Sequence, residues 1–336
     1  MIENWLRTNT EQRLTARPVE NLYFVYNRFG ILACTANIIE SVSEQNRLPI
    51  LHTLTSHVTK EKPVLTYGVL MSRADLDKEK TIFISSAVDL LWTFSLMYDD
   101  MFDHDQMRSS LPSAWVKFGS DETYQSASEG LERVKETATE VLSGTSGKTI
   151  DKLVGLGLSS LKLHKDMKPG VSVDELLENY RQRALFHTAL PFALVGMEIY
   201  RGDEAFQVTE NLNLAGQILN DLKDVSSNYV WVREGFSDIR TGVMTVPSAI
   251  LLGRLPGNDR DRFLSVFGKD QLTGEDKGVI AKMFDGSNSV NVAANLSLNL
   301  YEMSRLQFRN VLNPEFASYA DEWINYKIEQ LSELRK

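Results

Sequence analysis

Cysteine is almost absent from this chain of 336 residues, which contains only Cys34. A single cysteine excludes an intramolecular disulfide, and the apolar run Ile31-Leu32-Ala33-Cys34 favours a small buried side chain over a nucleophile. Proline is scarce too, and several of the nine prolines stand where helices should begin or end. Sustained two-residue alternation of apolar and polar residues, which marks strands, is hard to find. These absences predict an array of helices.

Positive charge is also in short supply. Lysine and arginine number 36 against 45 aspartates and glutamates, which gives a net charge of -9. This balance opposes nucleic-acid binding, because phosphates need a basic face. No apolar run approaches the roughly 18 to 20 residues that cross a bilayer, and residues 1 to 7 lack the pattern of a secretory signal. We therefore expect a cytoplasmic protein without stable membrane insertion, whose phosphate ligands arrive with metal ions.

Apolar residues recur at three- and four-residue spacing through most of the chain. One long helix is predicted from Thr81 to Met107. No stretch is long or biased enough to be a flexible interdomain linker, and no repeat of fixed period is present. The sequence thus predicts one all-α domain over residues 1–336.

Four carboxylates crowd the end of that long helix: Asp99, Asp100, Asp103 and Asp105. Asp99 and Asp103 are four residues apart and share a helix face, so their repulsion disfavours the helix end unless cations bind there. Magnesium typically takes one or two carboxylates together with substrate phosphates. The alternative is a solvated acidic helix end, although the apolar stretch just before the cluster favours burial.

A second polar cluster lies further along the chain. Asn220, Asp224 and Asn228 follow one another at intervals of four, so three oxygen-bearing side chains line one helix face. Asp221 is either a further ligand or a group that tunes its neighbours. Taken alone, this segment is as well explained by a polar surface stripe.

In their order, these segments resemble the trans-isoprenyl diphosphate synthase and class I terpene synthase superfamily, over about residues 60 to 252. The first aspartate-rich motif is matched by Asp99-Asp100-Met101-Phe102-Asp103, and the second by Asn220-Asp221-Leu222-Lys223-Asp224. The resemblance implies a helical bundle around a central cavity, where both motifs hold magnesium against a substrate diphosphate. It further implies three Mg²⁺ ions, Mn²⁺ as a possible substitute, and a homodimer.

The resemblance also assigns residues to roles. The implied catalytic residues are Asp99, Asp100, Asp103, Asn220 and Asp224, and the implied metal ligands are Asp99, Asp103, Asn220, Asp224 and Asn228. Arg108 and one of Arg181 or Arg183 are candidates to hold the diphosphate, with a plain surface role as the alternative for the latter two. A dry cavity for a carbocation needs aromatic faces, for which the candidates are Trp92, Phe94, Phe186 and Phe192. Ordinary helix core is the alternative for each of them.

Several departures concern the site where chain-elongating members bind isopentenyl diphosphate. Their basic element aligns only as Thr59-Lys60-Glu61-Lys62-Pro63, their histidine position is Trp92, and their second arginine is Ser109. Losing several charge-assisted hydrogen bonds predicts that this site does not function. The second motif is intermediate, since it keeps the asparagine of the cyclases and the aspartate of the synthases.

These observations lead to a hypothesis with two alternatives. The leading one is a class I terpene synthase that ionises an acyclic allylic prenyl diphosphate, of farnesyl type or related, and cyclises the carbocation. The first alternative is a trans-prenyltransferase that elongates an allylic diphosphate with isopentenyl diphosphate. The second is a non-catalytic subunit of a prenyl synthase, which would be expected to show decayed metal motifs.

Overall fold

The computed structural model describes residues 1–14, 17–57, 60–72, 76–196, 203–226, 235–269 and 271–335. In these ranges the regular structure is helical apart from one two-stranded hairpin, which confirms the predicted all-α fold. The chain divides into two compact units, each built from three separate stretches of sequence. The single domain over residues 1–336 stays a prediction.

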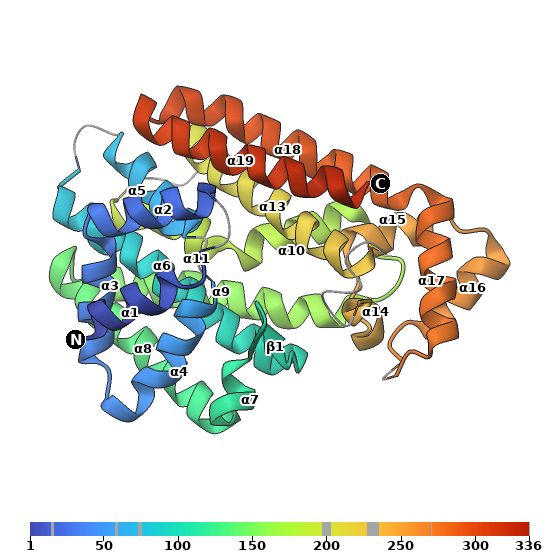
Figure 1. Cartoon of the computed structure of the whole chain (residues 1–336), viewed down its shortest axis with the longest axis horizontal. Coiled ribbons are helices and arrows are strands. Elements are labelled where there is room, and N and C mark those ends of the chain that lie inside the picture. Colours follow the sequence, from blue (N-terminus) through green and yellow to red (C-terminus); the bar gives the residue numbers. More distant parts are fainter. Residues whose placement is uncertain are drawn as a thin grey trace. The chain divides into compact units, whose positions relative to one another are not determined.

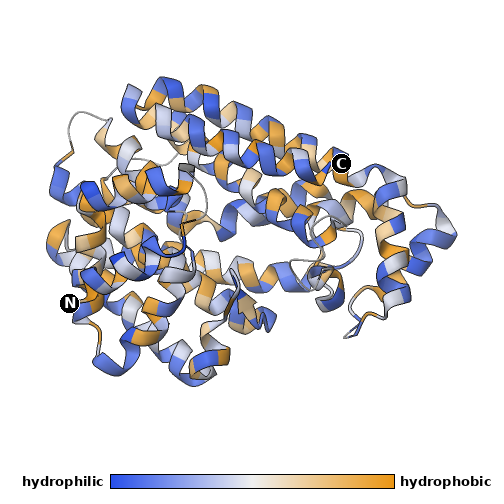
Figure 2. Cartoon of the chain, viewed as in Figure 1, coloured by the Kyte–Doolittle hydropathy of each residue, from blue (hydrophilic) through white to orange (hydrophobic). Residues whose placement is uncertain are grey.

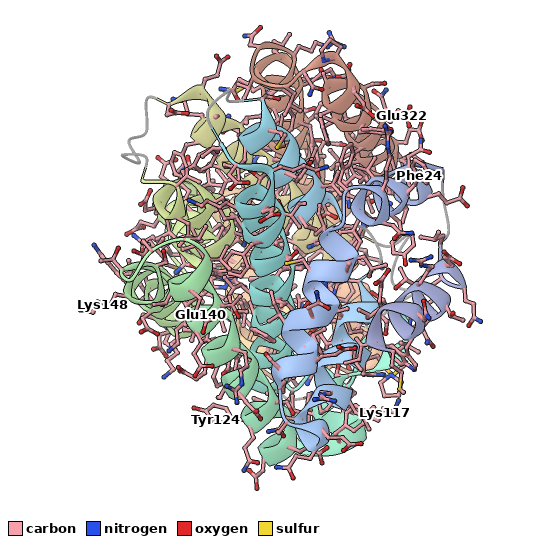
Figure 3. The ribbon with its side chains drawn as sticks, turned by 90° about the vertical axis from the view of Figure 1, so that its left-hand side faces the viewer. Phe24, Lys117, Tyr124, Glu140, Lys148 and Glu322 are labelled. Carbon is pink, nitrogen blue, oxygen red and sulfur yellow. The ribbon has the colours of Figure 1, made fainter. Side chains whose placement is uncertain are left out.

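Unit 1 consists of Met1–Gly155, Leu185–Phe206 and Phe308–Trp323. The helices wholly inside it are α1 (Ile2–Glu11), α2 (Arg17–Arg28), α3 (Ile31–Ser41), α4 (Glu44–Ser56), α5 (Glu61–Met71), α6 (Lys78–Asp103), α7 (Ala114–Phe118), α8 (Ser120–Val141), α11 (Leu185–Thr188) and α12 (Leu190–Leu194). Helices α3, α4, α5 and α8 all pack against α6. Figure 3 looks onto this unit and shows α6 between α8 and the N-terminal helices. Helix α6 is therefore its central element.

Both ends of α6 have a local cause. The side chain of Asp77 caps the first turn by accepting a hydrogen bond from the main-chain N–H of Glu79. The helix ends at Asp103, because His104 adopts the left-handed conformation with a φ of 56°. The predicted continuation to Met107 is therefore wrong. Asp99, Asp100 and Asp103 lie in the last turns of the helix, while Asp105 lies beyond its end.

The expectation about apolar runs also needs correction. Among the described residues, α6 is long and apolar enough to cross a bilayer by length and composition. However, 83% of its most apolar window is buried within the protein, as in the core helix of a globular protein. The pair Pro18–Arg28 and Ile31–Ser41 passes the same test together but bends by 68° between the two helices. Helix α6 is apolar on nearly all sides because other helices surround it.

A short hairpin follows α6. Strand β1 (Met107–Arg108) pairs antiparallel with β2 (Leu111–Pro112), with Arg108 opposite Leu111. The two loop residues, Ser109 and Ser110, have φ values of 48° and 66°, as a tight two-residue turn requires. Arg13 donates a hydrogen bond of 2.7 Å to the carbonyl of Ser109. The hairpin turns the chain back so that Arg108 reaches the acidic end of α6.

Unit 2 consists of Leu156–Ala184, Gln207–Gln307 and Ile324–Lys336. The helices wholly inside it are α10 (Val173–Arg183), α14 (Ser237–Thr241), α15 (Val246–Arg254), α16 (Gly257–Val266) and α17 (Gly274–Ser287). Four helices have residues in both units: α9 (Ser146–Asp166), α13 (Glu204–Val225), α18 (Ser289–Val311) and α19 (Pro314–Leu334). A capping box at Ser172 and Glu175 starts α10.

The unit 2 parts of α18 and α19 run antiparallel beside each other (Figure 1). Arg305 donates to Asn325 near one end of the pair and Arg335 to Asn295 near the other. Hydrophobic and hydrophilic residues alternate along both helices (Figure 2). This pattern is typical of helices that bury one face and leave the other to solvent.

Candidate active site

The end of α6 gathers the first acidic motif around one arginine. The Nε atom of Arg108 lies 2.9 Å from each carboxylate oxygen of Asp100, and its NH2 group also contacts Asp100. Asp100 is 2% exposed, whereas the side chain of Asp99 is 25% exposed and lies 3.9 Å from Arg108. Burial alone would lower the pKa of Arg108, but its contact with Asp100 raises it. Arg108 thus holds Asp100 in place and leaves Asp99 and Asp103 at the more open side of the cluster.

Asp105 follows the end of α6 and lies close to the carboxylates of the first motif. Burial, with Asp103, Asp100 and Asp99 nearby, raises the pKa of Asp105 to about 7. A carboxyl group that resists ionisation to this degree marks a site where a cation would be stabilised. In the part of the chain that is described, no group of three or more His, Cys, Asp or Glu side chains is placed to hold a metal ion. The pair Asp99 and Asp103 still fits Mg²⁺, which binds through one or two carboxylates and completes its shell with water and substrate phosphates.

Two of the four predicted cavity aromatics lie together in unit 1. The rings of Trp92 and Phe186 stack at a centroid distance of 6.5 Å. His187 meets the Trp92 ring edge-on at 5.1 Å. The ammonium group of Lys62 lies 3.5 Å from the centre of the Trp92 ring and donates a hydrogen bond of 2.8 Å to Nε2 of His187. A cation therefore stands directly beside position 92.

The other two aromatics are placed elsewhere. Phe94 is buried against α8, so closely that a Cβ atom on Gly130 would come within 2.5 Å of its ring. That added Cβ atom would also lie 3.1 Å from Ile50 of α4. Phe192 is buried and meets Phe206 edge-on at 6.3 Å. Phe94 and Phe192 thus occupy packing positions, and their place in a cavity stays a prediction.

Lys60, from the reduced basic element, is committed to the interior of unit 1. Its ammonium group is 3.0 and 3.2 Å from the two oxygens of Asp89, and Tyr26 donates a hydrogen bond of 2.6 Å to the same carboxylate. Burial raises the pKa of Asp89, but Lys60 and His57 outweigh it and lower the pKa to about 2. Lys60 therefore stabilises a buried carboxylate on α6. Thr59 lies outside the described residues.

The second motif lies on α13 in unit 2. Asp221 is buried, and its oxygens accept hydrogen bonds of 2.7 Å from Tyr180 and 3.1 Å from Gln217. Burial raises the pKa of Asp221 to about 6. Asp224 accepts main-chain N–H groups from Ser237 and Asp238 at 2.9 and 3.1 Å, which holds the start of α14.

The remaining predicted ligands of this motif are placed differently. Asn220 is exposed to solvent on α13. Asn228 lies outside the described residues, so its role as a ligand stays a prediction. The structure therefore brings Asp99, Asp100, Asp103 and Arg108 together in unit 1. It brings Asp221 together with Tyr180 and Arg183 in unit 2. That both motifs act on one diphosphate stays a prediction.

The two candidate arginines of α10 have different partners. Arg181 forms ion pairs with Glu210 at 3.2 Å and Glu178 at 3.4 Å. Arg183 instead donates a hydrogen bond of 2.8 Å to His164 and lies near enough to lower the pKa of Asp221. Arg181 is thus paired with two glutamates, whereas Arg183 is the candidate that lies beside Asp221 of the second motif.

Three functional candidates were missed from the sequence alone: Lys62, His187 and His164. Lys62 had a weak signal, because it belongs to the remnant of the basic element. The two histidines had none, since neither stands at a metal-ligand spacing and their partners lie 125 and 19 residues away.

The fold defined by these helices is that of prenyl diphosphate synthases. A decaprenyl diphosphate synthase from Rhodobacter capsulatus superposes with a TM-score of 0.75 at 15% identity, covering 93% of this chain and 99% of that one. A polyprenyl synthase from Caulobacter crescentus, solved with calcium and isoprenyl diphosphate, gives 0.73 at 17% identity, covering 94% and 97%.

Sequence comparison shows the family itself. Residues 37–284 match the sequence model of the family described as polyprenyl synthetase. A geranylgeranyl diphosphate synthase from Saccharolobus solfataricus is 26% identical over 242 residues, which cover 67% of this chain and 72% of that protein. The chain belongs to the polyprenyl synthetase family. This confirms the superfamily resemblance, whereas the narrower assignment to terpene cyclases is not confirmed.

Proposed function

We propose that this chain is a magnesium-dependent enzyme that breaks the bond between an allylic prenyl group and its diphosphate. The observation that carries the proposal is the end of α6, which holds Asp99, Asp100 and Asp103. Arg108 contacts Asp99 and Asp100 there, and the pKa of Asp105 is raised to about 7. Magnesium, when bound, supplies positive charge that stabilises the departing diphosphate. Asp99 and Asp103 are the side chains that would hold it.

Residues outside the two motifs have proposed supporting roles. Arg108 fixes Asp100, so the acidic end of α6 keeps its shape when the substrate changes charge. Arg183 presents a guanidinium group suited to paired hydrogen bonds with phosphate oxygens. Phe186, which stacks on Trp92, offers a ring face to the allylic carbocation, worth about 0.5 to 2 kcal/mol.

The proposed fate of the cation is capture by a second isoprenoid diphosphate, as in chain elongation. The relatives support elongation over cyclisation, because the compared proteins are named as prenyl diphosphate synthases. The structure supports it at position 92. The expected histidine is absent there, but Lys62 and His187 place a cation and an imidazole against the Trp92 ring. A diphosphate-binding function at this position therefore does not depend on the missing histidine.

Cyclisation of the same cation is the second candidate. It is favoured by the Trp92–Phe186 stack and by Lys60, whose buried pair with Asp89 withdraws it from phosphate binding. Both candidates share the ionisation step and differ only in the group that captures the carbocation.

Incubation with labelled isopentenyl diphosphate and an allylic diphosphate separates them. Elongation predicts label in a longer prenyl diphosphate. It also predicts that Lys62→Met raises the KM for isopentenyl diphosphate by about tenfold or more, because one charge-assisted hydrogen bond is lost. Lys78→Met, which removes an exposed lysine from the start of α6, is the matched control.

Two other results would overturn the order of the candidates or the proposal as a whole. An unlabelled cyclic hydrocarbon or cyclic alcohol, released together with diphosphate, would instead establish cyclisation. Absence of diphosphate release from every allylic substrate would contradict both candidates and favour the non-catalytic subunit.

A further inference from the structure

A strained hairpin connects the acidic end of α6 with α7. Its strands contain two residues each, and a ribbon of this length is at best marginally stable by itself. The turn residues Ser109 and Ser110, together with His104 just before the hairpin, have φ values of 48°, 66° and 56°. Residues with a Cβ atom rarely adopt this left-handed conformation. Contacts with other elements must therefore fix residues 104–112.

Two side chains hold the ends of this segment. Trp115 of α7 donates a hydrogen bond of 2.8 Å to the main-chain carbonyl of Asp105. Nε2 of His52, on α4, lies 2.7 Å from the carbonyl oxygen of Pro112 and must donate, because a carbonyl oxygen only accepts. These two contacts attach the base of the hairpin to α7 and α4, but they do not act on the turn.

Arg13 holds the turn itself. It stands two residues beyond the end of α1, and it donates a hydrogen bond of 2.7 Å to the carbonyl of Ser109, 96 residues further along the chain. An arginine near the C-terminus of a helix commonly interacts with the last carbonyl groups of that helix. Burial lowers the pKa of Arg13, so a partly desolvated guanidinium group lies against the hairpin. The contact thus serves the hairpin across the fold.

The turn determines the position of Arg108, which directly precedes Ser109. The Nε atom of Arg108 lies 2.9 Å from each carboxylate oxygen of Asp100. A paired contact of this kind depends on the direction of the guanidinium plane as well as on distance. A small shift of the β1 backbone would therefore weaken both hydrogen bonds together. Whatever holds Ser109 in place also decides whether Arg108 reaches Asp100.

We propose that Arg13 is a positioning residue, which holds the carbonyl of Ser109 so that the hairpin keeps Arg108 in contact with Asp100. Arg13 acts through the hairpin rather than on the substrate. The consequence for the reaction rests on the proposed function, in which the first acidic motif holds a metal ion. The positioning itself is a property of the chain without metal or substrate.

The exchange of the Arg108 Nε–H proton with solvent tests the inference on the full chain without metal or substrate. Nuclear magnetic resonance of protein that contains isotopically labelled arginine measures this rate, and the signal is assigned by its absence from Arg108→Lys. Arg13→Met should accelerate the exchange by about tenfold or more, because a turn without its outside contact lets Arg108 leave Asp100. An exchange rate that Arg13→Met leaves unchanged would overturn the inference.

A turn that needs no outside contact separates positioning from general stabilisation. The double variant Ser109→Asn/Ser110→Gly places at both turn positions the residues that favour this conformation. In that background, Arg13→Met should accelerate the exchange by less than about threefold, since the two changes are coupled. An equal acceleration in both backgrounds would show that Arg13 acts on the fold as a whole, which contradicts the proposal.

Arg7→Met is the matched control, because Arg7 lies on α1 and pairs with Glu3 of the same helix. It should leave the exchange rate within about twofold of that of the unaltered chain. An acceleration as large as that of Arg13→Met would refute a specific role for Arg13. If Arg13→Met does not fold, Arg13→Gln replaces it in every comparison. The glutamine side chain is too short to reach the turn, so the same acceleration is expected.

Diphosphate release from an allylic diphosphate is measured in parallel. Arg13→Met should slow the release by about threefold or more, and the Ser109→Asn/Ser110→Gly background should restore it. Proton exchange that depends on Arg13 in a chain without any turnover supports the positioning role and counts against the proposed function alone.

Discussion

In unit 1, cations hold the buried carboxylates of α6: Arg108 binds Asp100, and Lys60 binds Asp89. In unit 2, neutral donors hold the carboxylates of α13. Tyr180 and Gln217 bind Asp221, and main-chain N–H groups bind Asp224. The comparison shows two ways to fix a carboxylate. A paired cation offsets the charge of the carboxylate, whereas a neutral donor fixes its direction by hydrogen bonding.

At the acidic end of α6, one carboxylate pairs with an arginine and other carboxylates lie close by. Arg108 pairs with Asp100, while burial and then the neighbouring carboxylates raise the pKa of Asp105 to about 7. We expect this first acidic motif to be the part of the structure that binds metal.

Removing one carboxylate of the first acidic motif should have the largest effect. Asp99→Asn is expected to lower the rate of diphosphate release by about a thousandfold, because metal-assisted charge stabilisation is worth several kcal/mol. Far-ultraviolet circular dichroism should remain unchanged. Asp121→Asn, on the exposed start of α8, serves as the matched control. Turnover near that of the unaltered chain would show that Asp99 binds no catalytic metal.

Breaking the buried ion pair of unit 1 should have a large effect on stability instead. Lys60→Met leaves Asp89 buried without its cation, which should lower the free energy of unfolding by about 3 to 5 kcal/mol. Urea denaturation measures this change. The double variant Lys60→Met/Asp89→Leu should recover much of the loss, and a double variant as unstable as the single one would contradict the charge-pair explanation.

The neutral network of unit 2 predicts a smaller effect for the corresponding change. Tyr180→Phe removes one neutral donor from Asp221 and should cost about 1 to 2 kcal/mol in the same measurement. A loss as large as that of Lys60→Met would erase the distinction between the two units.

Variants of the two arginines of α10 test which of them binds the allylic diphosphate. Arg183→Ala should raise the KM for the allylic diphosphate by about 10- to 100-fold, as expected for one or two charge-assisted hydrogen bonds. Arg181→Ala should change it by less than about threefold, because partly exposed ion pairs contribute little. A larger effect at Arg181 would reverse the choice between them.

The pH dependence of stability gives the most local signal. The pKa of His164 is about 3 in the folded chain and 6.5 in the reference state, so between these values the unfolded chain binds the extra proton. Stability contributed by neutral His164 is thus complete above pH 6.5 and is lost as the pH falls toward 3. The slope is at most about 1.4 kcal/mol per pH unit. His164→Asn should flatten the unfolding free energy between pH 6.5 and 4, and an unchanged slope would argue against a neutral buried ring.

The central elements of this structure were predictable, and their ends and partners were not. The apolar spacing through residues 82 to 97 predicted α6, and the acidic residues after it predicted a cation site. The helix end was missed because His104 takes the left-handed conformation that glycine or asparagine usually marks. The hairpin was missed for a similar reason, since its turn is Ser109-Ser110 rather than the usual Asn-Gly.

Long-range partners explain the remaining differences. Lys60 reads as a remnant of a phosphate-binding element, yet its partner Asp89 lies 29 residues further along the chain. Arg181 and Arg183 are equivalent in the sequence, and only the placement of Glu210 and His164 separates them. Spacing along a helix predicts which side chains share a face, but it does not predict what packs against that face.

The most direct test of the central claim is the release of inorganic diphosphate from an allylic prenyl diphosphate while Mg²⁺ is titrated into chelator-treated protein. We predict no release without the ion, a saturable rise as it is added, and loss of that rise in Asp99→Asn. Release that is unaffected by the chelator, or none at any Mg²⁺ concentration, would contradict the account.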